Sequence, residues 1–128
     1  QGMPFYSGPV RYSYQYEHDQ ENRLFSLKLS DWYGAVATVS VNGEQVGILG
    51  WPPYQVDLAG LNKGANRVEI DVYGSLKNLY GPHHGKPGLG AAWPTGFLNA
   101  PKQGPPPGEE YDVLDYGLFE APILEGIQ

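Results

Sequence analysis

Hydrophobic and polar residues alternate with a period of two over several short segments of the chain. The clearest example is VRYSYQYE, residues 10–17, in which Val10 and every second residue after it, all of them Tyr, fall on one side. A period of two indicates a strand with one buried face. The pattern therefore predicts a half-buried β-strand near the start of the chain.

The same alternation predicts further strands along the chain. In NRVEIDVYG, residues 66–74, the apolar side chains of Val68, Ile70 and Val72 share one face. Asn42-Gly43 lies between two such segments and is a strong hairpin signal, because a type I′ turn needs positive φ at both central residues. The other strands are predicted at residues 23–30, 35–41, 44–49 and 54–58, with a last long one, broken at Gly117, at residues 111–124.

No window has convincing helical spacing, and the 18 Gly and 12 Pro residues suit strands joined by turns. The length of 128 residues suits one domain, residues 1–128, with enough surface buried for a real core. Short strands separated by turns predict an all-β sandwich or barrel of antiparallel strands, with the apolar faces packed between two sheets.

One long segment, residues 81–108, is rich in Gly and Pro. It shows neither the period of two of a strand nor the helical period of about 3.6 residues. A loop of this length in a compact domain is either functional or poorly ordered. It contains Trp93 and Phe97, and large apolar groups argue for packing against a ligand, the domain itself or a neighbouring domain.

Composition excludes several classes of function. The formal net charge of −6 and the lack of a basic cluster argue against a nucleic-acid partner or an anionic membrane surface. No apolar run approaches the roughly 20 residues needed to cross a bilayer. With no Cys there is neither a disulfide nor thiolate chemistry. The chain starts at Gln1 without a signal-peptide pattern, so we expect a domain cut from a larger multidomain protein.

The segment from residue 35 to residue 79 resembles the sugar-binding β-sandwich of glycoside hydrolases, the galactose-binding-like jelly roll of family-two enzymes such as β-galactosidase and β-glucuronidase. The resemblance covers about residues 10–75. PFYSGPVRYSY, NLYGPHHG and YGLFEAP are similar to the C-terminal accessory sandwich of large bacterial polysaccharide-degrading enzymes. The matching elements are Val41-Asn42-Gly43, Gly47, Pro53-Tyr54, Val56-Asp57-Leu58 and Lys63-Gly64-Ala65-Asn66.

This resemblance implies a jelly-roll sandwich of two antiparallel sheets, in a secreted, periplasmic or cell-surface bacterial protein. It implies no catalysis by this domain. Some relatives bind carbohydrate and others only buttress a catalytic domain, and fold alone does not separate the two. We therefore expect a non-catalytic carbohydrate-binding module of a glycoside hydrolase, monomeric when isolated, or alternatively a structural accessory sandwich that packs on the catalytic domain.

Trp51 and Tyr54 flank two prolines in the loop WPPY, and they are the first candidates for binding a polysaccharide or oligosaccharide. Trp and Tyr each join a flat apolar ring to a hydrogen-bonding tip, which suits a sugar ring and its hydroxyls. The prolines restrict the backbone and lower the cost of ordering the loop. The alternative interpretation is that Trp51 caps one end of the sandwich core.

The other candidate ligand-binding residues lie between the strand predicted at residues 66–74 and the last predicted strand. They are Asn78, His83, His84, Trp93 and Phe97. A zinc site at the adjacent His83 and His84 is disfavoured, because zinc needs three or four N or S ligands and the chain has three His and no Cys. A structural calcium ion stays open, since backbone carbonyls also ligate calcium, although Asp57 and Asn66 are more simply turn residues.

Catalysis by this chain alone is not expected. Glycoside hydrolysis needs two carboxyl groups in a cleft, and nothing marks the acidic residues at 109–115 as a desolvated acid and base. The sequence contains no nucleophile elbow, phosphate loop or HExxH motif. A stand-alone hydrolase is kept only as a third hypothesis.

Overall fold

The computed structural model describes residues 3–19, 24–81, 83, 104 and 111–127. The chain falls into two compact units. One comprises Gln1–Ser7 and Ser75–Asp115, and the other comprises Gly8–Gly74 and Tyr116–Gln128. The expectation of a single domain stays a prediction. The larger unit contains all the described strands, and the smaller contains the short helix α1 (Lys77–Tyr80).

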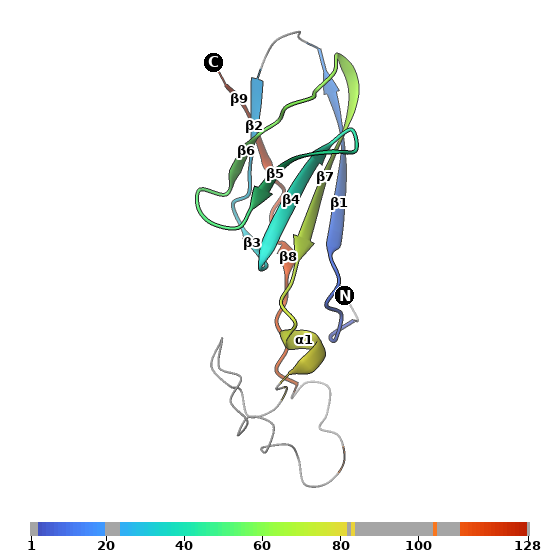
Figure 1. Cartoon of the computed structure of the whole chain (residues 1–128), viewed down its shortest axis with the longest axis vertical. Coiled ribbons are helices and arrows are strands. Elements are labelled where there is room, and N and C mark those ends of the chain that lie inside the picture. The colour runs from blue at the N-terminus through green and yellow to red at the C-terminus, as the bar shows by residue number, and fades with distance from the viewer. Residues whose placement is uncertain (1–2, 20–23, 82, 84–103, 105–110, 128) are drawn as a thin grey trace. The chain divides into compact units, whose positions relative to one another are not determined.

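Three antiparallel sheets make up the larger unit (Figure 1). Their strand orders are β1-β7-β4-β5, β6-β2-β9 and β3-β8. The strands are β1 (Val10–His18), β2 (Leu24–Lys28), β3 (Trp32–Tyr33), β4 (Val36–Val41), β5 (Glu44–Leu49), β6 (Gln55–Asp57), β7 (Gly64–Tyr73), β8 (Gly117–Leu118) and β9 (Ile123–Ile127). The larger sheets form a sandwich, which confirms the predicted all-β fold of antiparallel sheets.

The core lies between the two larger sheets and is built from the rows that alternation predicted. Ile70 and Val72 of β7 and Val39 of β4 are fully buried. Leu27 of β2 supplies the facing side from the second sheet. The remaining buried apolar residues are Leu29, Ala37, Val41, Leu49, Leu58 and Val68. Because β7 pairs with both β1 and β4, its inward row holds the four-stranded sheet to the core.

Gly47 lets the two sheets approach each other. A Cβ at this position would clash with the side chain of Val56 on β6. Gly47 lies opposite Val39, on the inward face of β5. The close approach explains physically why the matched pattern has glycine here.

The polar turn between β6 and β7 is held by the amide of Asn66, which is 2% exposed. Its Oδ1 accepts from the main-chain N–H of Asn62 at 2.8 Å and from Asn42 Nδ2 at 2.9 Å. Its Nδ2 donates to the carbonyl oxygens of Asn62 and Gly64 at 2.7 and 2.9 Å. Asn66 lies at the start of β7 and bonds to nearby turn backbone, as expected, and it connects this turn to the hairpin at Asn42, whose φ is 52°.

The structure corrects the predictions at two places, the C-terminal end of the chain and the segment after β7. No long strand covers residues 111–124, because residues 111–116 are outside regular structure and β9 begins only at Ile123. Asp112 donates its N–H to the carbonyl of His83 at 2.9 Å, so this segment is bonded within the smaller unit. The helix α1 was not predicted, since four residues are too few to show a helical period.

The described part of the chain includes no helix with the length and apolar character needed to cross a membrane.

Replacing Asn66 with Ala should lower the free energy of unfolding by about 2–4 kcal/mol, because it leaves buried polar groups of the turn without partners. Urea denaturation followed by circular dichroism measures the loss. Asn62→Ala is the matched control. Asn62 contributes only main-chain atoms to this network, so its change should stay within about 0.5 kcal/mol. Equal losses in the two variants would contradict the assignment.

Candidate functional site

Trp51 is the most exposed large apolar residue of the described chain, with 75% of its surface accessible. It follows Gly50 at the end of β5 and is followed by Pro52 and Pro53, which are also exposed. The alternative interpretation that Trp51 caps the core is therefore wrong. An exposed indole beside two prolines is a rigid apolar surface that suits the face of a sugar ring.

Tyr54 has a different environment from Trp51. Its ring lies edge-on to that of Trp32, with centroids 5.0 Å apart and an interplanar angle of 88°. Its main-chain oxygen accepts from the N–H of Leu29 at 2.9 Å, and both rings pack against the core. Tyr54 thus anchors the loop that presents Trp51. Trp32, which the sequence reasoning did not single out, packs on the core.

Exposed apolar residues also lie on the outer face of the four-stranded sheet, beside the Trp51 loop. Tyr73 of β7 pairs directly with Val36 of β4, and Thr38 pairs with Ile48 of β5. Ile48 is 56% exposed and Tyr73 is 37% exposed. Neither residue was predicted as part of a site. The alternation of side chains along β5 places Ile48 on the outward face. Only the pairing register of the strands shows that Ile48 lies near Val36.

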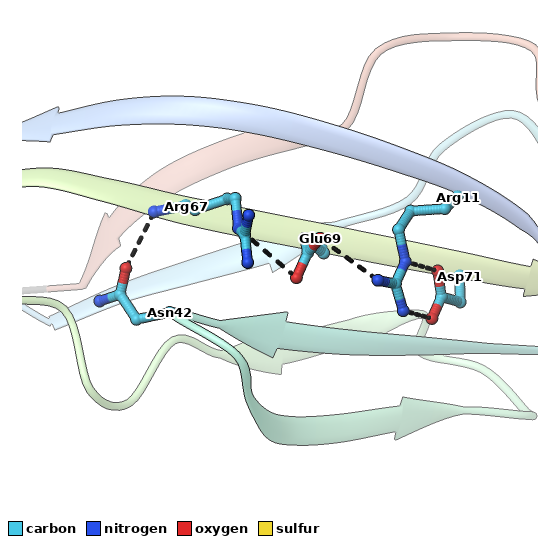
Figure 2. Close-up of polar contacts among 5 residues, drawn as sticks. All are labelled: Arg11, Asn42, Arg67, Glu69 and Asp71. Atoms are coloured by element: carbon cyan, nitrogen blue, oxygen red, sulfur yellow. Dashed lines mark hydrogen bonds and ion pairs between the residues drawn. The ribbon is translucent and has the colours of Figure 1, made fainter.

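Further along the same outer face, charged residues of β1 and β7 form a network (Figure 2). Arg11 donates to both carboxylate oxygens of Asp71 at 2.7 Å, and it also reaches Glu69 at 3.4 Å. Arg67 lies 3.7 Å from the second oxygen of Glu69. The main-chain N–H of Arg67 donates to Asn42 Oδ1 at 2.9 Å, which connects the network to the hairpin turn.

This network holds Asp71 as a carboxylate. The hydrogen bonds from Arg11 lower the pKa of Asp71, against the opposing effect of burial. The same bonds raise the pKa of Arg11 above its ordinary value. A glycosidase general acid needs the reverse, a carboxyl group whose pKa is raised so that it carries a proton near neutral pH. Asp71 is therefore suited to stabilising the sheet rather than to acid catalysis.

Asn78 and His83 lie in the smaller unit and hold its segments together. Asn78 is 5% exposed, its Nδ2 donates to the carbonyl of Leu114 at 2.7 Å, and its Oδ1 accepts from the Leu114 N–H at 2.8 Å. His83 Nε2 lies 3.0 Å from the main-chain oxygen of Asn78. The expectation that Asn78 contacts a ligand is corrected here, because its amide is buried and bonded to main chain.

Aromatic contacts complete this part of the smaller unit. The ring of His83 lies edge-on to Phe5, with centroids 5.2 Å apart, and Tyr111 contacts both rings at 5.3–6.0 Å. Beside them, Lys77 Nζ forms an ion pair with Asp112 Oδ2 at 3.3 Å. His83 thus acts in the described structure as a packing residue. The three remaining candidates, His84, Trp93 and Phe97, lie outside the described residues and stay predictions.

No cluster of metal-ligating side chains is found in the described ranges. Within residues 3–19, 24–81, 83, 104 and 111–127, no group of three or more His, Asp or Glu side chains could hold an ion. The main-chain oxygens of Asn62 and Gly64 accept hydrogen bonds from Asn66. A structural calcium ion held by other carbonyl oxygens stays a prediction.

Comparison with known proteins gives a likeness to a solved structure. No family model matches the chain, and no curated protein matches it. Among solved structures, the chain is similar to a rhamnosidase from Novosphingobium sp. PP1Y, with 27% identity and a TM-score of 0.61. The match covers 94% of this chain but 11% of that chain. The chain thus corresponds to a small part of a large glycoside hydrolase, consistent with a β-rich accessory domain.

Replacing Asp71 with Asn should lower the free energy of unfolding most at neutral pH. The pKa of Asp71 is lower in the folded state than in the unfolded state. The carboxylate therefore contributes to the free energy of unfolding above about pH 4, and this contribution is lost as the pH falls through the folded-state pKa. The difference between wild type and variant should therefore shrink in acid, as measured by urea denaturation at several pH values. Asp57→Asn, at an exposed β6 carboxylate, is the control. A difference independent of pH would contradict this role.

Proposed function

We propose that the chain is a non-catalytic carbohydrate-binding module of a glycoside hydrolase. The observation that supports this most strongly is the 75% exposure of Trp51 at the rim of a sandwich whose inward apolar rows are buried. Because the short loop already holds the ring in place, little further conformational entropy is lost when a sugar stacks on it. Tyr54, packed against Trp32, keeps that loop in place.

The ligand of such a site is an oligosaccharide or polysaccharide, and the domain works beside a catalytic domain. One similar solved protein is a rhamnosidase, which makes rhamnose-containing glycans the first ligands to test. A single exposed ring buries little area, so affinity for one sugar unit is low and increases with chain length. The galactose-binding-like jelly roll and a location outside the cytoplasm belong to the same proposal.

The second candidate is a structural sandwich that packs on a catalytic neighbour. Exposed apolar side chains in the smaller unit favour it. Leu76 is 61% exposed, Leu79 is 47% exposed and Tyr80 is 66% exposed, all on or next to α1. Adjacent exposed apolar residues often mark contact with another protein surface. This candidate predicts no glycan binding by the isolated chain, which separates it from the first.

Replacing Trp51 with Ala should weaken glycan binding by at least about tenfold, since the aromatic face is the main apolar contact of the site. Calorimetry or a glycan array with the isolated chain measures this. Because Trp51 is exposed, the free energy of unfolding should change by no more than about 0.5 kcal/mol.

Tyr80→Ala is the matched control for this experiment, because it removes an exposed aromatic ring from the other unit. It should leave glycan affinity unchanged. If no glycan binds the wild-type chain, the binding proposal fails and the structural candidate takes its place. Release of reducing sugar by the isolated chain would contradict both.

A further inference from the structure

The strand β1 forms one edge of the four-stranded sheet, and its outer side is open. β1 is first in the order β1-β7-β4-β5, so β7 pairs with one side of it and no described strand pairs with the other (Figure 1). All 9 residues of β1 pair with β7 in one unbroken register, from Val10 with Val72 to His18 with Gly64. The open edge is therefore long and regular.

Hydrogen bonds of β7 show which main-chain groups of β1 face the open side. The N–H of Asn42 donates to the carbonyl oxygen of Arg67 at 2.8 Å, and the Arg67 N–H donates to Asn42 Oδ1 at 2.9 Å, so both main-chain groups of Arg67 point toward the β4 side. Because these groups alternate in direction along a strand, the even-numbered residues of β7 direct theirs toward β1, where they pair with even-numbered residues. The odd-numbered residues of β1 therefore direct their N–H and C=O groups to the open side. They are Arg11, Ser13, Gln15 and Glu17.

The open side of β1 lacks the features that usually protect an edge strand from pairing. β1 contains no Pro, no Lys and no bulge. In the part of the chain that the structure describes, its outward N–H and C=O groups have no main-chain partner. The strand at the other edge of the sheet, β5, differs, because its register shifts between Val39 and Ser40 and Val56 of β6 packs against its Gly47.

The side chains of β1 are complementary to a second copy of the same strand. In an antiparallel pair centred on Tyr14, Arg11 lies opposite Glu17 of the second copy, and Ser13 lies opposite Gln15. Opposite charges on directly paired residues stabilise a sheet. This register also places odd-numbered residues opposite one another, as the direction of their open N–H and C=O groups requires, and it pairs the whole strand.

Both charged side chains are available for this contact. Arg11 has five N–H donors, of which three are directed at Asp71 and Glu69, and its side chain remains 60% exposed. The ion pairs within the chain hold the guanidinium in place. Glu17 is exposed, and no ion pair to its carboxylate is found among the described residues.

We propose that two copies of the chain associate through antiparallel pairing of β1 with β1, centred on Tyr14. The two four-stranded sheets then form one continuous sheet across a twofold axis, and association ends at the dimer because both open edges are used. One pair of strands is a small interface beside the ~1,600 Å² of typical stable complexes, so the dimer is weak and forms at high concentration. This inference is independent of the proposed function, and it differs from the monomer that the sequence led us to expect.

Sedimentation equilibrium of the full chain, over concentrations from about 10 μM to about 1 mM, tests the association. The average mass should rise with concentration from that of a monomer toward that of a dimer and no further. A monomer at every concentration, or growth beyond the dimer, would overturn the inference.

Glu17→Arg tests whether β1 is the paired edge. It places like charges opposite each other at two positions, so the dissociation constant of the dimer should increase about fivefold or more. Glu44→Arg is the matched control, because Glu44 is also exposed, lies on β5 at the other edge of the sheet, and undergoes the same change in net charge. Equal effects in the two variants, or no effect of Glu17→Arg, would overturn the assignment to β1.

Single cysteines test the register, since the chain has no Cys of its own. Ser13 and Gln15 are both exposed, and in the proposed pair their Cα atoms lie about 5.5 Å apart across the interface, which permits a disulfide. A mixture of Ser13→Cys and Gln15→Cys, oxidised with glutathione disulfide, should form the mixed dimer faster than either variant forms its own, as measured by mass spectrometry. Equal rates for all three dimers would overturn the register.

Two further variants separate this edge from the other surfaces of the chain. Tyr80→Ala removes an exposed ring of the smaller unit, and Trp51→Ala removes the ring that follows β5. Both should leave the dimer unchanged. Loss of the dimer in either variant would place the association elsewhere and overturn the inference. Failure of the wild-type chain to bind any glycan would overturn the proposed function, whereas a dimer sensitive to Glu17→Arg would still support this inference.

Discussion

The inward row of β7 is the constraint on which the rest of the structure depends. Val68, Ile70 and Val72 are buried on one face, and β7 pairs with β1 on one side and β4 on the other. With a strict period of two, burying this row fixes which residues point outward. It therefore sets the charged network at Asp71 and, through β4, the outward direction of Val36 and Ile48. The exposed surfaces of this sheet follow from how the core is packed.

Alternation and turn chemistry predicted most of the sandwich. The rows of β1 and β7 were predicted correctly because one face of each strand is apolar at every second residue, and β4 was predicted as a strand. The hairpin at Asn42-Gly43 was predicted correctly because few residue pairs tolerate positive φ at both positions. The bonding of Asn66 to nearby turn backbone followed from its residue type, although the sequence did not show that its amide also bonds to Asn42, 24 residues away.

What the sequence could not give was the environment of individual side chains. Nothing in the order of residues distinguishes Trp32, which packs on the core, from Trp51, which is exposed. Asn78 looked like a ligand-binding amide, but its partner Leu114 is 36 residues away. The neighbours of Ile48 depend on a register that includes a bulge between Val39 and Ser40. Each of these properties is decided by long-range pairing, which a local pattern does not encode.

The central claim is that the sandwich core excludes Trp51 and leaves its indole as the ring on which a sugar stacks. The most direct measurement is the indole N–H signal of Trp51 in an NMR titration of the whole chain with a rhamnose-containing oligosaccharide, assigned by Trp51→Phe. The account predicts that this signal moves in a saturable way while the signal of core-packed Trp32 stays in place. A Trp51 signal that does not respond, with the shifts confined to residues elsewhere, would contradict it.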